Sequence, residues 1–87
     1  MHEVRMLKAA ARDLARLDKE IARRVLERIR WLADNFQSIK PQPLAADLAG
    51  LCKLREGDYR IIYEVLRNEK KIVVHAIGHR SQIYRRK

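Results

Sequence analysis

Lysine and arginine stand in the middle of segments that alternate like β-strands in the C-terminal part of this 87-residue chain. Lys53, Arg55 and Arg60 occupy such positions, and Gly78-His79-Arg80 and Tyr84 follow further along. Cations that share one strand face repel one another unless an anion binds between them. Cations with a tyrosine and a histidine close by are suited to bind a phosphodiester.

The net charge of +9 is concentrated in the same part of the chain. Residues 51–87 hold 10 Lys/Arg and 4 Asp/Glu, whereas residues 1–50 hold 10 and 7. This excess favours a polyanionic partner, nucleic acid first and an acidic protein second. An anionic membrane ranks third, because no segment has the pattern of an amphipathic anchor. The alternative that the charge serves no particular partner stays open.

The length of the chain predicts one domain, residues 1–87, with one two-layer core and an active site on an open surface. The single cysteine, Cys52, excludes an intrachain disulfide and is expected to be a small core residue. No apolar run is long enough to span a membrane, and no secretory signal region follows Met1. We therefore expect a cytoplasmic protein.

The first half of the chain predicts a strand and a helical hairpin. Residues 3–7 have the composition of a short strand, and apolar residues then recur at helical spacing from Leu7 to Leu17 and from Ile21 to Phe36. Asp18 between them is the expected N-cap of the second helix. Pro41-Gln42-Pro43 ends the helical region, and residues 37–50 are expected to form a connection with one short helical turn at 44–48.

A β-hairpin with a two-residue turn is predicted at residues 56–59. Gly57 in the first central position, followed by Asp58, suits a type II′ turn. This register places Arg55 opposite Arg60 on one side of the hairpin, together with Lys53. The other side then consists of apolar side chains: Cys52, Leu54, Ile61 and Tyr63.

The last predicted strand is the apolar segment 71–79, whose continuity is typical of a central strand. His75 within it is expected to be a histidine with a hydrogen-bond partner in or beside the core. Residues 79–86 form a basic tail with a short helical turn, on which Arg80 and Tyr84 share one face. The fold class is α+β: an N-terminal strand, a helical hairpin and a mostly antiparallel sheet of three further strands.

Three segments of the chain resemble the RelE family of toxins from type II toxin-antitoxin pairs. They are Lys53-Leu54-Arg55, Tyr59-Arg60-Ile61-Ile62-Tyr63 and Gly78-His79-Arg80. The helical hairpin and the length fit as well, so the resemblance covers nearly the whole chain. It implies a toxin that enters the ribosomal A site and cleaves mRNA there, and that forms a hetero-oligomer with a cognate antitoxin.

The resemblance also implies the site residues. Catalytic roles fall on Lys53, Arg60, Arg80 and Tyr84, and Arg55 lies on the same active surface. We expect Arg55, His79, Arg85 and Arg86 to bind RNA. No metal or cofactor is implied, because RNA supplies its own nucleophile, the 2′-OH.

The roles within this set are open in part. Arg60 and Arg80 are expected to clamp the scissile phosphate. Lys53 is either a further clamp or a general base, and Tyr84 is a base, an acid or a stacking platform. His79 is a spare acid or base that its alternation with Arg80 turns away from the site. Leu51 stands where some relatives carry a second lysine.

Two alternatives from other functional classes are kept. The related ParE branch poisons DNA gyrase through protein binding and is not a nuclease. A nucleic-acid-binding module without catalysis is the second alternative, and it would lose affinity uniformly when single cations are removed.

Overall fold

The computed structural model of the chain describes residues 2–39, 42–43 and 50–83. Its helices are α1 (Lys8–Ala15) and α2 (Lys19–Asn35), and 3₁₀ turns lie at Phe36–Ser38 and Arg67–Glu69. The strands are β1 (Glu3–Met6), β2 (Gln42–Pro43), β3 (Leu51–Glu56), β4 (Tyr59–Leu66) and β5 (Lys71–His79). The predicted α+β class and the N-terminal strand followed by two helices are confirmed.

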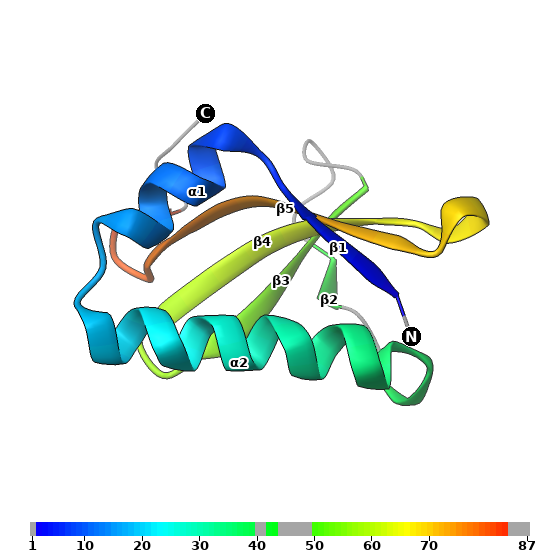
Figure 1. Cartoon of the computed structure of the whole chain (residues 1–87), viewed down its shortest axis with the longest axis horizontal. Helices are drawn as coiled ribbons and strands as arrows, with labels where there is room; N and C mark the ends of the chain where they lie inside the picture. The colour runs from blue at the N-terminus through cyan, green and yellow to red at the C-terminus, as the bar shows by residue number, and fades with distance from the viewer. Residues whose placement is uncertain (1, 40–41, 44–49, 84–87) are drawn as a thin grey trace.

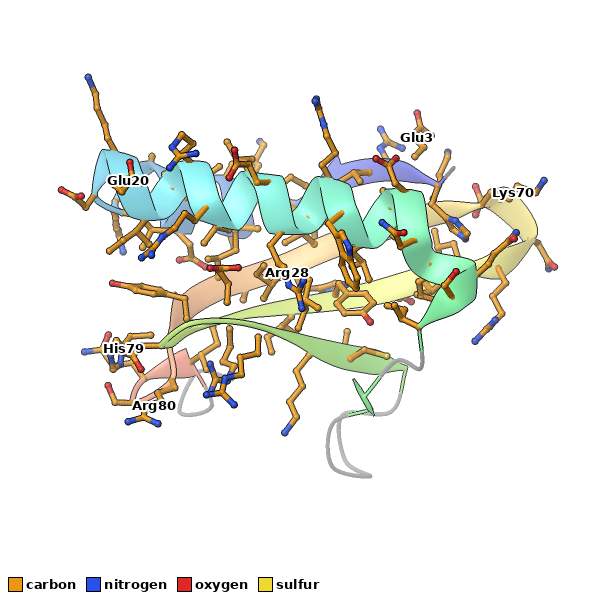
Figure 2. All side chains as sticks on the ribbon, turned by 90° about the horizontal axis from the view of Figure 1, so that it is seen from below. Glu3, Glu20, Arg28, Lys70, His79 and Arg80 are labelled. Carbon is orange, nitrogen blue, oxygen red and sulfur yellow. The ribbon has the colours of Figure 1, made fainter. Side chains whose placement is uncertain are left out.

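Both helices cover the same face of the sheet (Figures 1 and 2). Helix α1 packs on β5, and α2 packs on β1 and β3. The helical spacing predicted this arrangement, because Val25, Ile29 and Leu32 lie on one side of α2 and are buried. Asp18 occupies the N-cap position of α2 as expected, although its side chain makes no capping hydrogen bond.

The core lies between these two layers. The helical side contributes Ala10, Val25, Ile29, Leu32, Ala33 and Phe36, and the sheet contributes Leu54, Ile61, Tyr63, Ile72, Val74 and Ile77. Cys52 packs against this cluster, as expected.

The strands are ordered β1-β5-β4-β3-β2, so β5 is an inner strand as predicted. Strand β1 is parallel to β5, and the other neighbours are antiparallel. The short edge strand β2 was not foreseen within the connection 37–50. Proline is tolerated there because an edge strand need not donate every ladder hydrogen bond. The helical turn expected at 44–48 lies outside the described residues.

The β3–β4 hairpin has the predicted register. Glu56 pairs with Tyr59 and Arg55 with Arg60. Gly57 has φ +59°, whereas no non-glycine residue of the described chain except Lys70 has a positive φ. A positive φ at the first central residue alone is the signature of a type II′ turn.

A β-bulge interrupts the pairing of β4 with β5. Ile62 pairs with Ala76 and Tyr63 with Val74, so His75 is an extra residue on β5. The bulge lets Val74 and Ile77 both face the core although they are three residues apart. The His75 Nε2 atom lies 3.0 Å from Glu64 Oε1, which confirms the expectation of a partnered histidine.

Beyond the end of β1, the edge of β5 is covered by helix α1 and not by another strand. The pairing of β1 with β5 ends at Met6 and Val74. Further along β5, the backbone N–H of Ile77 donates a hydrogen bond of 2.9 Å to Oδ2 of Asp13. Asp13 is a buried carboxylate, so this bond satisfies two groups that would otherwise be costly to bury.

Lys70 closes the turn between β4 and β5 in the left-handed conformation, with φ 53° and ψ 47°. Its N–H donates to the Arg67 carbonyl, and its own carbonyl accepts a hydrogen bond from the Glu3 N–H. This backbone conformation costs a residue with a Cβ atom about 1–2 kcal/mol, whereas glycine adopts it freely.

Within the described part of the chain, no helix is long and apolar enough to cross a membrane.

The Asp13–Ile77 hydrogen bond gives a stability prediction. We expect Asp13→Ala to lower the free energy of unfolding by about 1–3 kcal/mol, because it leaves a buried N–H without its acceptor. Asp13→Asn keeps an acceptor oxygen and should recover part of the loss. Urea denaturation followed by circular dichroism measures both, with the exposed carboxylate change Asp34→Ala as the control. Equal stability of Asp13→Ala and Asp34→Ala would contradict the assignment.

Burial of Tyr63 predicts a loss of stability at alkaline pH. Burial raises the pKa of the Tyr63 phenol from 10.0 to about 12. The folded state therefore holds the proton more tightly than the unfolded chain, and this contribution is complete below pH 10 and lost as the pH rises towards 12. Urea unfolding of the wild type and of Tyr63→Phe between pH 8 and 11.5 measures the effect. The variant should lose less stability over this range, and parallel curves would disprove the attribution.

Candidate active site

The cations of the hairpin share the face of the sheet that the helices do not cover. Their neighbours Leu54, Ile61 and Tyr63 point into the core, so the alternating residues Lys53, Arg55 and Arg60 project from the opposite face. Figure 2 shows α2 on one side of the sheet and Arg80 on the other. The structure thus confirms that the sequence separates a core side from a cationic side.

An apolar residue lies among these cations. Ile62 pairs with Lys53 across the hairpin and is only 6% exposed, although it lies on the outer face. Lys53 and Arg60 are themselves half-buried, whereas Arg55 is exposed. Charges beside a buried apolar surface are less screened than charges in water, so an anion bound here would be held more strongly.

Arg60 is held at the tip of its own hairpin. Its Nη1 atom donates hydrogen bonds of 2.9 Å to the carbonyls of both Gly57 and Tyr59. These bonds orient the guanidinium and offset part of its repulsion with Arg55. They use only Nη1, so Nε and Nη2 provide the remaining donors for a bidentate contact to an anion. Gly78 of β5 pairs with Arg60 and has no side chain that could obstruct the approach of an anion to the guanidinium.

Arg80 is attached to the same hairpin tip. Its backbone N–H donates a 2.8 Å hydrogen bond to the carbonyl of Asp58. Its Nε atom lies 3.8 Å from Asp58 Oδ1 in an exposed ion pair. Arg60 and Arg80 therefore both contact the turn of residues 57–58, although they lie 20 positions apart in the sequence. Sequence reasoning treated Asp58 only as a turn residue and missed its contact with Arg80.

His79 lies on the other face of the sheet from the cations. It pairs with Tyr59, and the two rings meet edge to face with centroids 5.5 Å apart. Its Nδ1 atom lies 3.1 Å from the backbone nitrogen of Ser81 and 2.8 Å from the Ser81 hydroxyl oxygen, so the ring is held against the turn that follows β5. The orientation away from the cationic face agrees with the predicted alternation, and the RNA-binding role expected of His79 stays a prediction.

Helix α2 is attached to the strand that carries Arg55. The Arg28 Nε atom donates to the Arg55 carbonyl at 3.3 Å. Its guanidinium also lies over the Trp31 ring, 4.2 Å from the centroid. These contacts hold the end of β3 against the helix and leave the Arg55 side chain on the outer face.

Tyr84, Arg85 and Arg86 lie outside the described residues. The described chain ends at Ile83, which is buried and lines a pocket together with Leu17 and Ile77. The chain after β5 therefore turns back towards α1, as Figure 1 shows. The roles expected of the three terminal residues stay predictions.

Cys52 has no features of a nucleophile. Burial raises the pKa of its thiol, and the Arg67 charge opposes this only in part. The neutral thiol is favoured, and the thiolate is the reactive form. Among the described residues, no group of three or more His, Cys, Asp or Glu side chains is arranged to hold a metal ion.

Residues 4–84 match the family described as the ParE toxin of the type II toxin-antitoxin system parDE. The chain belongs to this RelE/ParE toxin family. It is 34% identical over 84 residues to Toxin RelE of Mycobacterium tuberculosis, an alignment that covers 97% of this chain and 87% of that protein. Toxin RelG of the same organism is 34% identical over 89 residues, with 98% of each chain covered.

The fold agrees with a solved member of the family. In the crystal structure of the toxin-antitoxin complex RelBE2 from Mycobacterium tuberculosis, a matching chain superposes with a TM-score of 0.81 at 29% identity. The match covers 90% of this chain and 96% of that chain. The protein is thus a toxin of a type II toxin-antitoxin system with the RelE-like fold.

The contact of Asp58 with Arg80 predicts the effect of removing this carboxylate. We expect Asp58→Asn to bind a short RNA oligonucleotide several-fold more tightly at low salt, because Arg80 loses a competing anion. Stability should change by less than about 1 kcal/mol, since exposed ion pairs contribute little. Fluorescence anisotropy measures the affinity. Glu20→Gln makes the same charge change at the start of α2, and an equal gain in this control would refute a local effect.

Proposed function

We propose that this toxin is a ribosome-dependent endoribonuclease that cleaves mRNA in the A site and so inhibits translation. The observation that carries the proposal is the pair Arg60 and Arg80 at one hairpin tip, beside Lys53 and Arg55 on the open face of the sheet. Four cations on one small surface suit a phosphate whose charge grows during the reaction. The 34% identity to Toxin RelE of Mycobacterium tuberculosis supports the same proposed function.

The reaction needs four contributions from the surface. The 2′-OH of one nucleotide attacks the adjacent phosphorus, the bond to the 5′-oxygen of the next nucleotide breaks, and a 2′,3′-cyclic phosphate forms. The protein must align these atoms, accept the 2′-OH proton, stabilise the phosphate oxygens and protonate the departing 5′-oxygen. No step requires a metal or a cofactor.

The residues are assigned to these contributions by their positions. Arg60 and Arg80 clamp the non-bridging phosphate oxygens, because each guanidinium can donate two parallel hydrogen bonds. Lys53, half-buried beside Ile62, lies closest to the apolar part of the surface and acts as a further clamp or as the general base. Arg55 binds the RNA strand at the exposed edge. Tyr84 lies outside the described residues, and its predicted role as acid, base or stacking platform rests on the family resemblance alone.

A cognate antitoxin is the protein partner. The solved relative was crystallised as a toxin-antitoxin complex. An antitoxin segment with acidic side chains would cover the cationic face, which gives a physical reason for neutralisation. The complex is a hetero-oligomer of toxin and antitoxin.

One observation favours a second candidate function, the poisoning of DNA gyrase. The family that matches residues 4–84 is described by its ParE toxin. A gyrase poison would use the same fold to bind a protein and would leave RNA intact. Gyrase supercoiling in the presence of the toxin tests this candidate separately.

The clamp gives the prediction that tests the proposal. We expect the wild type to cut a defined mRNA within codons during translation by purified ribosomes, and Arg60→Ala to lower the cleavage rate by about 100-fold or more. The cuts are mapped by primer extension. Arg24→Ala removes an exposed arginine from α2 and should cleave like the wild type. Intact mRNA with the wild type, or equal loss in both variants, would contradict the proposal.

A further inference from the structure

A second cationic site lies at the other end of the sheet from the hairpin tip. Figure 2 shows Lys70 at one end and Arg80 at the other, and β5 runs between them. A pocket of about 400 Å³ opens beside Lys70. It is lined by His2, Phe36, Gln37, Ile39, Arg67 and Lys70.

The polar groups of this pocket are mostly hydrogen-bond donors. A guanidinium, an ammonium, an imidazole and a side-chain amide surround it, and none of its lining residues is acidic. Glu3 and Glu69 are neighbours of lining residues in the sequence, but the carboxylates of both lie within ion-pair distance of Lys71. The Lys71 ammonium lies 3.8 Å from Glu3 and 3.6 Å from Glu69. Within the described chain, no carboxylate lies within ion-pair distance of Arg67 or Lys70.

Aromatic contacts hold this pocket in shape. The His2 ring packs against Phe36 with centroids 4.8 Å apart. The Arg67 guanidinium lies over the same ring, 5.8 Å from its centroid. Phe36 is itself buried in the core at 7% exposure, so core packing holds its ring in place at the bottom of the pocket. Two of the donors are thus positioned by one buried ring, which lowers the entropy lost when an anion binds.

The backbone of Lys70 provides an independent observation. Lys70 is the one non-glycine residue of the described chain with a positive φ. Glycine or asparagine would close this turn with less strain. Strained residues concentrate at functional positions, where the side chain is required. Here the strained residue places an ammonium on the rim of a pocket that already contains a guanidinium.

We propose that this pocket binds a backbone phosphate of RNA at a site separate from the cleavage surface. Four donors, with no carboxylate of the described residues at ion-pair distance from Arg67 or Lys70, fit an anion, and the net charge of +9 favours RNA over an acidic peptide. The pocket would tether the toxin to structured RNA while the hairpin tip acts on another strand. That this RNA is ribosomal rests on the proposed function.

Salt dependence of ribosome binding tests the proposal. Binding of the toxin to purified 70S ribosomes without mRNA is measured by sedimentation between 50 and 300 mM KCl. We expect Lys70→Gly to make the slope of log affinity against log salt shallower by about 1, and Lys70→Gly with Arg67→Gln by about 2. Lys70→Gly relieves the strained backbone, so its melting temperature should equal or exceed that of the wild type. A loss of binding by Lys70→Gly therefore cannot arise from unfolding, and the melting temperature of the double variant is measured beside it.

Matched controls distinguish a local site from general charge. Lys19→Ala and Arg24→Ala remove the same number of charges from exposed positions of α2 and should leave the slope unchanged. An unchanged slope in the pocket variants, or an equal change in the controls, would overturn the proposal. Polyglutamate is the second probe. If the pocket variants lose as much affinity for polyglutamate as for ribosomes, the pocket recognises carboxylates, and the RNA assignment is wrong.

Failure of the nuclease proposal would give a different result. If the wild type leaves mRNA intact but the pocket variants still show the shallower slope, the pocket is an RNA phosphate site without the cleavage activity. If the wild type cleaves and the slope does not change, the pocket proposal alone fails.

Discussion

The two-residue turn between β3 and β4 is the constraint on which the rest of this structure depends. Side chains on a strand alternate between two faces, so a shift of one residue would exchange the core side and the cationic side completely. Gly57 adopts the positive φ that the turn requires, and Arg55 then pairs with Arg60 while Leu54 pairs with Ile61. The same turn contacts both arginines assigned to the phosphate clamp, through the carbonyls of Gly57 and Asp58.

This arrangement explains how so small a protein can form a charged site. The described residues share one hydrophobic core, and the two helices cover only one face of the sheet. The opposite face can therefore carry cations at little cost to packing. Arg60 donates hydrogen bonds to backbone carbonyls, so its charge is held in place before any ligand arrives, and the backbone N–H of Arg80 is bonded to the same turn. Such preorganisation is the main source of electrostatic catalysis.

Much of this fold could be predicted because its signals are local. The glycine of the turn and the alternation of Leu54 with Lys53 and Arg55 depend only on neighbours in the sequence. The bulge at His75 was not foreseen, because a nearly continuous apolar segment has the same sequence pattern with or without an extra residue. The bond from Ile77 to Asp13 joins residues 64 positions apart, and no spacing rule predicts such a contact.

The candidate site shows the same division. The shared face of Lys53, Arg55 and Arg60 followed from the register, and so did the separation of His79. The contact of Arg80 with Asp58 depends on how the chain turns after β5, and the sequence carries no signal for that geometry. The pocket of Arg67 and Lys70 was missed for a related reason, because His2 and Phe36 reach it from distant parts of the chain.

The most direct test of the central claim is the chemistry at the cut. An mRNA with a single 2′-deoxynucleotide at the mapped cleavage position is translated by purified ribosomes with the wild-type toxin, and the fragment ends are identified by mass spectrometry. If the RNA supplies its own nucleophile, the all-ribose mRNA yields a 2′,3′-cyclic phosphate and a 5′-hydroxyl, and the substituted position is not cut. Cleavage at the 2′-deoxy position would contradict the account.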